Sequence, residues 1–167
     1  MAVRSKVSEP LTAPGFPELK ARNLNGLELN IPVDLCHRAT VLVVALKRSH
    51  VPMVESWLPH LEQIAAEIAG TNFYELPTLP AMYAAVRGII DNGIAQQHCD
   101  KKNSCEHTFT VYTNQALFMK NARIASGDTI HIFLLDSAGQ VVYRATGPWS
   151  EQKGKVLKES ILAIDSP

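Results

Sequence analysis

The sequence predicts one α/β domain in which a mixed central β-sheet is flanked by layers of helices, and three observations support this fold class. Two continuous, β-branched apolar runs, at residues 40–46 and 129–135, are typical of strands buried on both faces, and we expect them to be neighbouring central strands. Strand-like and helix-like patterns alternate along the chain. Residues 141–145 follow a Gly-containing turn and return beside the second run, which adds an antiparallel edge.

The start of the chain predicts a tail followed by a hairpin. Pro10, Pro14 and Pro17 favour extended backbone, so we expect a mobile N-terminal tail over residues 1–15 and one domain over residues 16–167. Asn25-Gly26 is a strong turn signal with apolar residues on both sides, and it predicts a small hairpin within residues 24–31.

A helix is predicted to follow the first buried run. Pro52 suits a first helical turn, and Gly70 ends the pattern. Pro59 lies inside the helix and is expected to kink it, because proline removes one backbone hydrogen bond. One face is apolar at spacings of three and four, and we expect it to turn Trp57 towards the core; its members are Met53, Trp57, Leu61, Ile64 and Ile68.

The second half of the chain continues the alternation. We predict a strand at residues 72–76, a strand at 107–112 and a long polar loop over residues 91–106. Asn114 and Ser150 are expected to cap two helices through their side chains. Pro80 is predicted to begin another helix with a buried apolar side made of Met82, Val86, Ile89 and Ile90. The apolar set of the last helix is Val156, Leu157, Ile161 and Leu162.

Composition limits the partners. Lys and Arg number 16, and so do Asp and Glu, so the chain lacks the positive charge that nucleic-acid binding needs. No apolar run is long enough to span a membrane, and residues 1–15 lack the apolar core of a signal peptide. We therefore expect a soluble protein, cytoplasmic in preference to exported, with a processed precursor as the alternative. No phosphate-binding loop or catalytic triad stands out, so we expect no cofactor.

The run at 40–46, the helix containing Pro59 and the hairpin sequence TIHIFLLDSAGQVVYRATG together resemble the thioredoxin and peroxiredoxin superfamily over residues 16–164. The resemblance implies a thioredoxin-like three-layer sandwich. In redox-active thioredoxins a Cys-x-x-Cys begins this helix, and its second cysteine lies five residues before the proline. That count falls on Val51 and Val54, and valine cannot form a thiolate. Residues 126–129 also lack the proline that the superfamily holds in the cis form before the next strand.

A narrower resemblance is to the thioredoxin-like assembly factors of mitochondrial ATP synthase and their bacterial relatives. The matching segments are residues 16–19, 32–35, 54–57, 74–77, 87–93 and 110–113. This family is thought to chaperone assembly of the membrane sector of ATP synthase without enzymatic chemistry. The resemblance implies a non-catalytic module that binds a protein, such as a subunit of a membrane complex.

Four residues form a cluster of metal-type ligands: His98, Cys99, Cys105 and His107. Their spacing is not that of a standard zinc site, so we expect no metal there. A disulfide between Cys99 and Cys105 would close a short loop, whereas a reducing compartment would leave two free thiols. A rival function is therefore a thiol-disulfide or peroxidase-type redox protein that uses these two cysteines. Cys36 precedes the first buried run, on the wrong side for a peroxidatic cysteine.

Two further patterns remain open. Arg87 and Asp91 are four residues apart on a predicted helix, so they form either an ordinary solvent-exposed pair or a patch that recognises a partner. Residues 47–50 follow the first buried run, at the end of the sheet where α/β proteins bind ligands. A third possible function is therefore a small-molecule binding domain that uses the vacated groove. His131 alternates with apolar residues and is interpreted as a core histidine.

Overall fold

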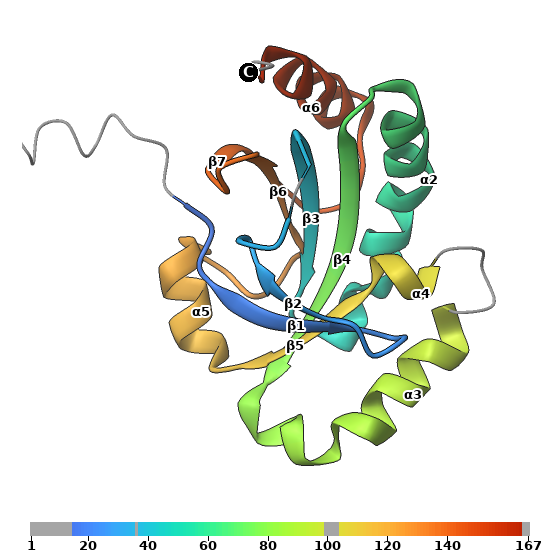
Figure 1. The fold of residues 1–167 in the computed structure, drawn as a ribbon, viewed down its shortest axis with the longest axis vertical. Coiled ribbons are helices and arrows are strands. Elements are labelled where there is room, and N and C mark those ends of the chain that lie inside the picture. The colour runs from blue at the N-terminus through green and yellow to red at the C-terminus, as the bar shows by residue number, and fades with distance from the viewer. Residues whose placement is uncertain (1–14, 36, 99–103, 165–167) are drawn as a thin grey trace, which may run out of the picture.

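The computed structural model describes residues 15–35, 37–98 and 104–164, apart from the side chains of residues 97, 98, 104 and 105. Its centre is a seven-stranded mixed sheet in the order β2-β1-β5-β4-β3-β6-β7 (Figure 1). The strands are β1 (Leu19–Asn23), β2 (Glu28–Ile31), β3 (Ala39–Ala45), β4 (Thr71–Pro80), β5 (Phe109–Thr113), β6 (His131–Asp136) and β7 (Val141–Thr146). The helical elements are η2 (Arg48–His50), α2 (Val51–Glu67), η3 (Ala81–Val86), α3 (Arg87–His98), α4 (Ser104–His107), α5 (Gln115–Ala122) and α6 (Glu151–Ala163).

Helices cover both faces of this sheet, which gives the predicted three layers. On one face, Trp57 and Leu61 of α2 and Leu157 of α6 pack against alternate residues of β3 and β6 such as Val41. On the other face, residues of α5 and of the N-terminal segment pack against the intervening strand residues, and the members include Phe16, Leu42, Phe118 and Phe133. Alternation along each strand supplies the two cores, because successive side chains point to opposite faces.

Several predictions of local structure are confirmed. β3 and β6 are neighbours in the interior of the sheet and run antiparallel, with Val41 opposite Leu134. β1 and β2 form a hairpin around the predicted Asn25-Gly26 turn, although its first strand lies before the predicted range 24–31. α2 continues through Pro59, and Trp57 is fully buried. Two side-chain caps are present: Asn114 accepts a hydrogen bond from the backbone of Leu117, and Ser150 accepts one from the backbone of Lys153.

Two predictions about residues 80–106 are wrong. Residues 91–98 are helical and belong to α3, and residues 104–107 form α4, so the polar segment is not one loop. The apolar side expected to be buried faces outward, since Met82 is 78% exposed and Ile89 is 77% exposed. In the last helix, Leu157 and Ile161 are buried as expected, but Leu162 is exposed. No helix in the described part of the chain is long and apolar enough to cross a membrane.

Candidate functional site at the carboxyl edge of the parallel strands

β3, β4 and β5 run parallel, so their carboxyl ends lie at one edge of the sheet, which we call the carboxyl edge. The segments that follow these ends are η2 with the start of α2, then η3, and then α5. The side-chain amide of Gln115 connects two of them, because it donates to the carbonyl oxygens of Leu46 at 3.2 Å and of Thr78 at 2.7 Å. Ligands of open α/β sheets bind at such edges.

The first turn of α2 is aliphatic. Val51 is its first residue and is partly buried, and Val54 is buried in the core beneath the helix. Met53 lies in the same turn, and its sulfur accepts a hydrogen bond from the Thr129 hydroxyl at 3.5 Å. The structure therefore places both valines at a helix start that follows a central strand. That they occupy the positions of a lost dithiol stays a prediction.

His50 lies just before α2 and is buried. Its Nδ1 accepts the backbone N–H of Leu46 at 3.1 Å, so a neutral ring carries its proton on Nε2. Nε2 has no hydrogen-bond partner among the described residues, although the backbone of Asp128 faces the ring. Burial, helped by the nearby ammonium of Lys47, lowers the pKa of His50. The ring is therefore a neutral structural group at neutral pH.

An ion pair, Lys47 with Asp128, and a hydrogen bond from His131 to the loop residue Ser126 lie at the carboxyl edge. Lys47 Nζ lies 2.8 Å from the Asp128 carboxylate, which lowers the pKa of that carboxyl. Both side chains are exposed, so the pair contributes little stability. His131 is buried as predicted, and its Nε2 lies 2.7 Å from the Ser126 carbonyl oxygen. Apart from Gln115, His50 and His131, which bond to backbone groups, the side chains described at this edge offer apolar contacts and one surface ion pair.

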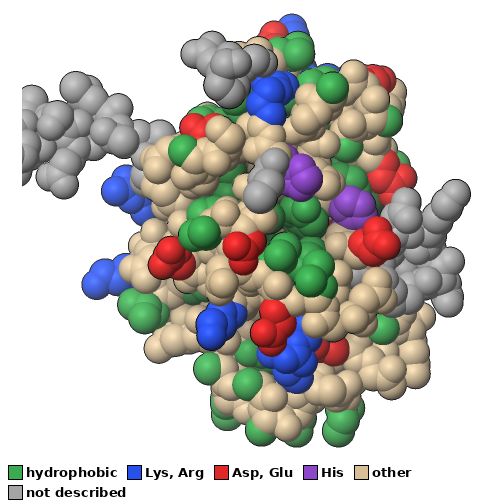
Figure 2. Space-filling view, viewed as in Figure 1, with side chains coloured by type: hydrophobic (Ala, Val, Ile, Leu, Met, Phe, Trp, Pro, Cys, Tyr) green, Lys and Arg blue, Asp and Glu red, His purple; other side chains and the backbone are tan. Residues whose placement is uncertain are grey.

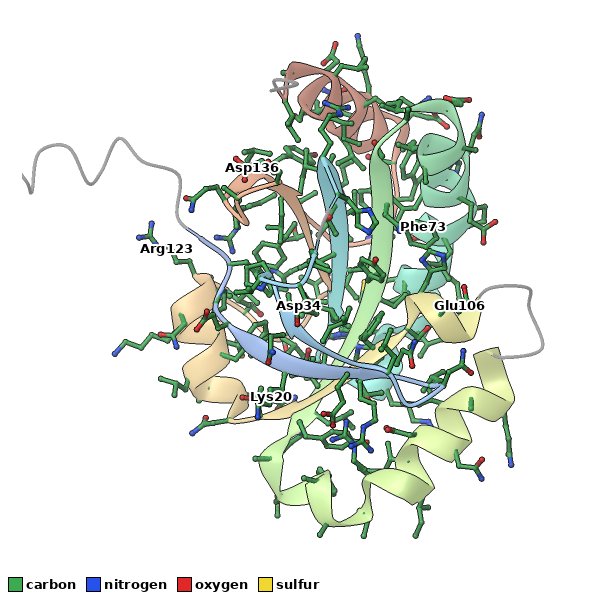
Figure 3. All side chains as sticks on the ribbon, in the orientation of Figure 1. Lys20, Asp34, Phe73, Glu106, Arg123 and Asp136 are labelled. Atoms are coloured by element: carbon green, nitrogen blue, oxygen red, sulfur yellow. The ribbon has the colours of Figure 1, made fainter. Side chains whose placement is uncertain are left out.

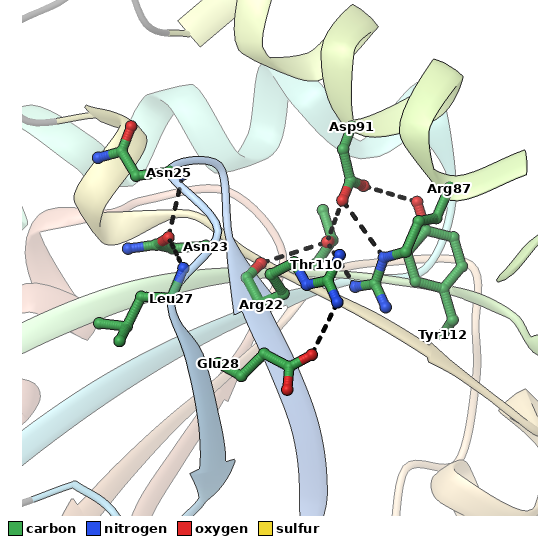
Figure 4. Close-up of polar contacts among 9 residues, drawn as sticks. All are labelled: Arg22, Asn23, Asn25, Leu27, Glu28, Arg87, Asp91, Thr110 and Tyr112. Carbon is green, nitrogen blue, oxygen red and sulfur yellow. Dashed lines mark hydrogen bonds and ion pairs between the residues drawn. The ribbon is translucent and has the colours of Figure 1, made fainter.

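Arg87 and Asp91 belong to a polar network and not to an isolated surface pair (Figure 4). Arg87 Nε lies 3.5 Å from Asp91, and both side chains are partly buried. Asp91 accepts hydrogen bonds from the hydroxyls of Tyr112 at 2.6 Å and Thr110 at 3.2 Å. The Arg87 guanidinium also lies 4.5 Å from the centre of the Tyr112 ring. The network joins α3 to β5 and partly covers the pair, so it differs from the ordinary solvent-exposed pair of the first alternative; that the pair recognises a partner stays a prediction.

A second pair extends the network towards β1. Arg22 lies 2.7 Å from Glu28 across the β1–β2 hairpin, and the Thr110 hydroxyl, whose single proton goes either to Asp91 or to this strand, lies 3.3 Å from the Arg22 carbonyl oxygen. Sequence reasoning missed Arg22, Thr110 and Tyr112 as members. One signal was available, because the alternation of residues 109–113 puts Thr110 and Tyr112 on the same face of a strand.

The segment that this network supports carries an exposed apolar surface. All six residues of η3 are exposed, and none of them is charged. We define the α3 surface as η3 together with Ile89; its large side chains are Met82, Tyr83, Val86 and Ile89. Figure 2 shows hydrophobic side chains gathered along the lower edge of the molecule, where Figure 1 places this segment. Figure 3 shows side chains of the segment projecting away from the sheet.

The predicted ligand cluster is only partly described. Cys99 lies outside the described residues, and so do the side chains of His98 and Cys105. His107 ends α4; its ring stacks on Phe73 at 4.6 Å, and its Nδ1 lies 2.8 Å from the Phe73 carbonyl oxygen. The described residues include no group of three or more metal-type ligands. Whether Cys99 and Cys105 are bonded stays open, and Cys36 also lies outside the description.

A small cavity lies away from the carboxyl-edge residues described above. It has a volume of about 10 Å³, which is room for about one water. Its lining includes Phe16, Ala122, Phe133 and Arg144. This cavity therefore gives no support to the small-molecule alternative, which placed a ligand beside Val51 and Val54.

Comparison with known proteins gives a fold but no family. No family model matches the chain, and no curated protein matches it. Yeast Sco1 with copper bound is similar in structure, with a TM-score of 0.63, 12% identity and coverage of 93% of this chain and 96% of that chain. BsSco, a member of the Sco family of cytochrome c oxidase assembly proteins, is also similar, with a TM-score of 0.62, 9% identity and coverage of 90% of this chain and 95% of that chain. The thioredoxin domain of a thiol-disulfide oxidoreductase from Bacteroides vulgatus has a TM-score of 0.59 and 12% identity, with coverage of 90% of this chain and 97% of that chain. Similarity at these identities establishes the fold, and the chain therefore has a thioredoxin-like α/β fold.

Proposed function

We propose that this chain is a non-catalytic thioredoxin-fold protein that binds another protein through its α3 surface and acts as an assembly or chaperone module. The observation that carries the proposal is the run of six uncharged, exposed residues in η3, followed by the exposed Ile89. Contiguous apolar surface on a folded domain marks an interaction site more often than scattered apolar residues do. The expected partner is a protein, such as a subunit of a membrane complex, as the resemblance to assembly factors implies.

The support beneath the surface strengthens the proposal. α3 is fixed to β5 by hydrogen bonds from Tyr112 and Thr110 to Asp91 and by the ion pair of Asp91 with Arg87. A surface that is already ordered loses less conformational entropy on binding than a flexible segment would. This arrangement gives Arg87 and Asp91 a positioning role behind the docking surface, in place of direct contact with the partner.

The chemistry of α2 supports a non-catalytic role. The nucleophile of a thiol oxidoreductase is a thiolate, and the first turn of α2 contains Val51, Pro52, Met53 and Val54. This chain shares its fold with BsSco, which belongs to a family of assembly proteins. The fold is therefore used for assembly in BsSco. The rival function is thiol redox chemistry at Cys99 and Cys105.

Two measurements test the proposal. Insulin reduction in the presence of dithiothreitol should stay at the uncatalysed rate; turnover that disappears in a Cys99→Ser/Cys105→Ser variant would establish the redox rival instead.

For binding, a native lysate is passed over the wild type, a Met82→Glu/Ile89→Glu variant and a Leu162→Glu control. We expect the same identified protein on the wild type and on the control, and its loss on the double variant. Equal capture on all three would remove the α3 surface from the proposal.

A further inference from the structure

The segment between β3 and α2 is fixed to the molecule by one buried side chain. Lys47, Arg48 and Ser49 are exposed, whereas His50, the last residue of η2, is 1% exposed. The His50 N–H donates to the Lys47 carbonyl oxygen at 3.0 Å, and this bond stays within the segment. The ion pair of Lys47 with Asp128 lies in solvent and adds little. The imidazole of His50 is therefore the main anchor of η2.

The hydrogen bond of this anchor requires a neutral imidazole. Nδ1 of His50 accepts the backbone N–H of Leu46 at 3.1 Å. A protonated imidazole has N–H donors on both ring nitrogens and no acceptor. In the charged ring, Nδ1–H would face the Leu46 N–H, so two donors would oppose each other inside the fold. A single proton therefore removes the bond and also places a charge in a buried position.

The surroundings of the ring disfavour that charge. Burial is the main cause of the lowered pKa of His50, and the Lys47 ammonium and a charged His131 on β6 act in the same direction. In the loop before β6, the backbone and the carboxylate of Asp128 favour the charged ring, but this carboxylate is exposed and paired with Lys47. The first turn of α2, residues 51–54, contains no charged side chain. The closed arrangement therefore selects the neutral ring.

We propose that His50 is an acid-sensitive latch: when its ring binds a proton it leaves its buried position, and residues 47–50 separate from the end of β3. In water both ring nitrogens can donate, so the open form binds a proton as an ordinary exposed histidine does. Opening frees the Leu46 N–H and uncovers the first turn of α2, where Val51 and Met53 are partly buried. The latch lies at the carboxyl edge and not at the α3 surface, so it is independent of the proposed function.

Proton linkage determines the pH range and the size of the effect. An ordinary histidine has a pKa of 6.5, and the pKa of His50 in the closed form is lower. Below about pH 6.5 the open form therefore binds a proton before the closed form does, and acid shifts the population towards the open form. For one proton, the ratio of open to closed molecules should rise by up to about 25-fold between pH 7 and pH 5.

The test is hydrogen exchange of the backbone amides of the full chain, followed by NMR at pH 7 and pH 5 and corrected for the intrinsic pH dependence of exchange. Protection of the Leu46 amide should fall at least about threefold and at most about 25-fold. It should also be lower than the protection of the interior amides of β6, and low urea concentrations should leave it unchanged, because a local opening exposes little surface.

Two variants identify the titrating group. In His50→Gln the amide oxygen can still accept the Leu46 N–H but does not titrate, so Leu46 protection should be the same at both pH values. His131→Gln is the matched control, because it replaces the other buried histidine of this edge in the same way. This control should keep the pH dependence of the Leu46 amide.

Several outcomes would overturn the inference. Leu46 protection that is the same at both pH values in the wild type excludes the latch, and so does a fall that persists in His50→Gln. Protection equal to that of the interior amides of β6 would mean that the whole fold opens. If His50→Gln does not fold, the ring-nitrogen chemical shifts of the wild type decide. They must place the proton of His50 on Nε2 at pH 7, and a proton on Nδ1 refutes the latch.

Discussion

The hydroxyl of Tyr112 donates a hydrogen bond of 2.6 Å to Oδ1 of Asp91 and so joins the end of β5 to the middle of α3. Burial and the adjacent carboxylate raise the pKa of Tyr112 well above its ordinary value, so the hydroxyl keeps its proton. α3 presents apolar residues to the solvent instead of burying them against the sheet. Side-chain hydrogen bonds of this kind therefore contribute more to holding α3 on the sheet than they do for a helix with a buried apolar face.

Replacing Tyr112 by phenylalanine is therefore expected to loosen α3. Loss of a hydrogen bond to a partly buried carboxylate should lower the free energy of unfolding by about 1–2 kcal/mol. Urea unfolding measures the change, and hydrogen exchange of the α3 amides should accelerate. Tyr83→Phe is the matched control, because Tyr83 is exposed and its hydroxyl has no partner among the described residues. Equal stability of the two variants would show that the Tyr112 hydroxyl does not anchor α3.

Gly154 is expected to tolerate no side chain. A Cβ at this position of α6 would overlap the Cη2 and Cζ2 atoms of Trp149, which is itself stacked on the His60 ring at 3.8 Å. Gly154→Ala should therefore cost about 1–3 kcal/mol, since overpacking displaces the indole or the helix. Gly93→Ala in α3 is the control: its Cβ meets nothing within 4 Å, and the alanine should stabilise the helix by up to about 1 kcal/mol. Thermal unfolding of both variants checks the contrast, and a neutral Gly154→Ala would contradict the packing.

Acid is expected to weaken the fold through two buried histidines, His50 and His131, and the partly buried His37. Burial is the main cause of the lowered pKa values of His37, His50 and His131, compared with 6.5 for an ordinary histidine. Between the lowered pKa and 6.5 the unfolded chain binds more protons than the folded chain. Stability is therefore complete above about pH 6.5 and falls below it, by up to about 1.4 kcal/mol per pH unit for each histidine.

Urea unfolding at pH 8, 7, 6 and 5 measures this dependence. In a His50→Gln variant, the amide oxygen can still accept the Leu46 N–H but does not titrate, so the loss between pH 7 and pH 5 should become smaller. A wild type that gains stability on acidification would refute the role assigned to these histidines.

The counted redox positions can be tested by restoring the cysteines. In a background where Cys36, Cys99 and Cys105 are serine, the Val51→Cys/Val54→Cys variant should form an intramolecular disulfide on mild oxidation. A thiolate at the first turn of α2 is stabilised by the positive end of the helix, so insulin reduction should rise above the background rate. Thiol titration and insulin turnover are the measurements. The control pair, Glu55→Cys/Leu58→Cys, has the same spacing one turn later and should stay reduced; free thiols in the first variant would mean that the count from Pro59 is wrong.

The sequence was informative where structure depends on local chemistry or continuous burial. The runs that became β3 and β6 could be recognised because strands buried on both faces have no polar alternation. The caps at Asn114 and Ser150 could be recognised because each side chain bonds within its own helix turn. In contrast, residues 91–98 were expected to form a loop, since few of them are apolar. They are helical, and contacts of the Asp91 side chain hold the helix.

The candidate site was less predictable, for a physical reason. Spacing alone indicated that Arg87 and Asp91 could pair, but not that Thr110 and Tyr112 would cover them, because that depends on how β4 and β5 align. The pattern Met82, Val86, Ile89 and Ile90 predicted one buried helix side, whereas Met82 and Val86 belong to the 3-10 segment η3 and, with Ile89 of α3, are exposed. Periodicity does not say what covers such a side, and here no described part of the chain does.

The order of the strands also determines when this sheet can form. β1 pairs with β5 through Arg22 and Thr110, which are 88 residues apart in the chain. β3 cannot complete its pairing until β6 has been made, because Val41 lies opposite Leu134 of β6. Closing such long loops is slow, so folding is expected to take milliseconds to seconds and not microseconds. During synthesis, β3 emerges from the ribosome long before its partner β6, and its apolar residues stay without their final neighbours until the last quarter of the chain has been made.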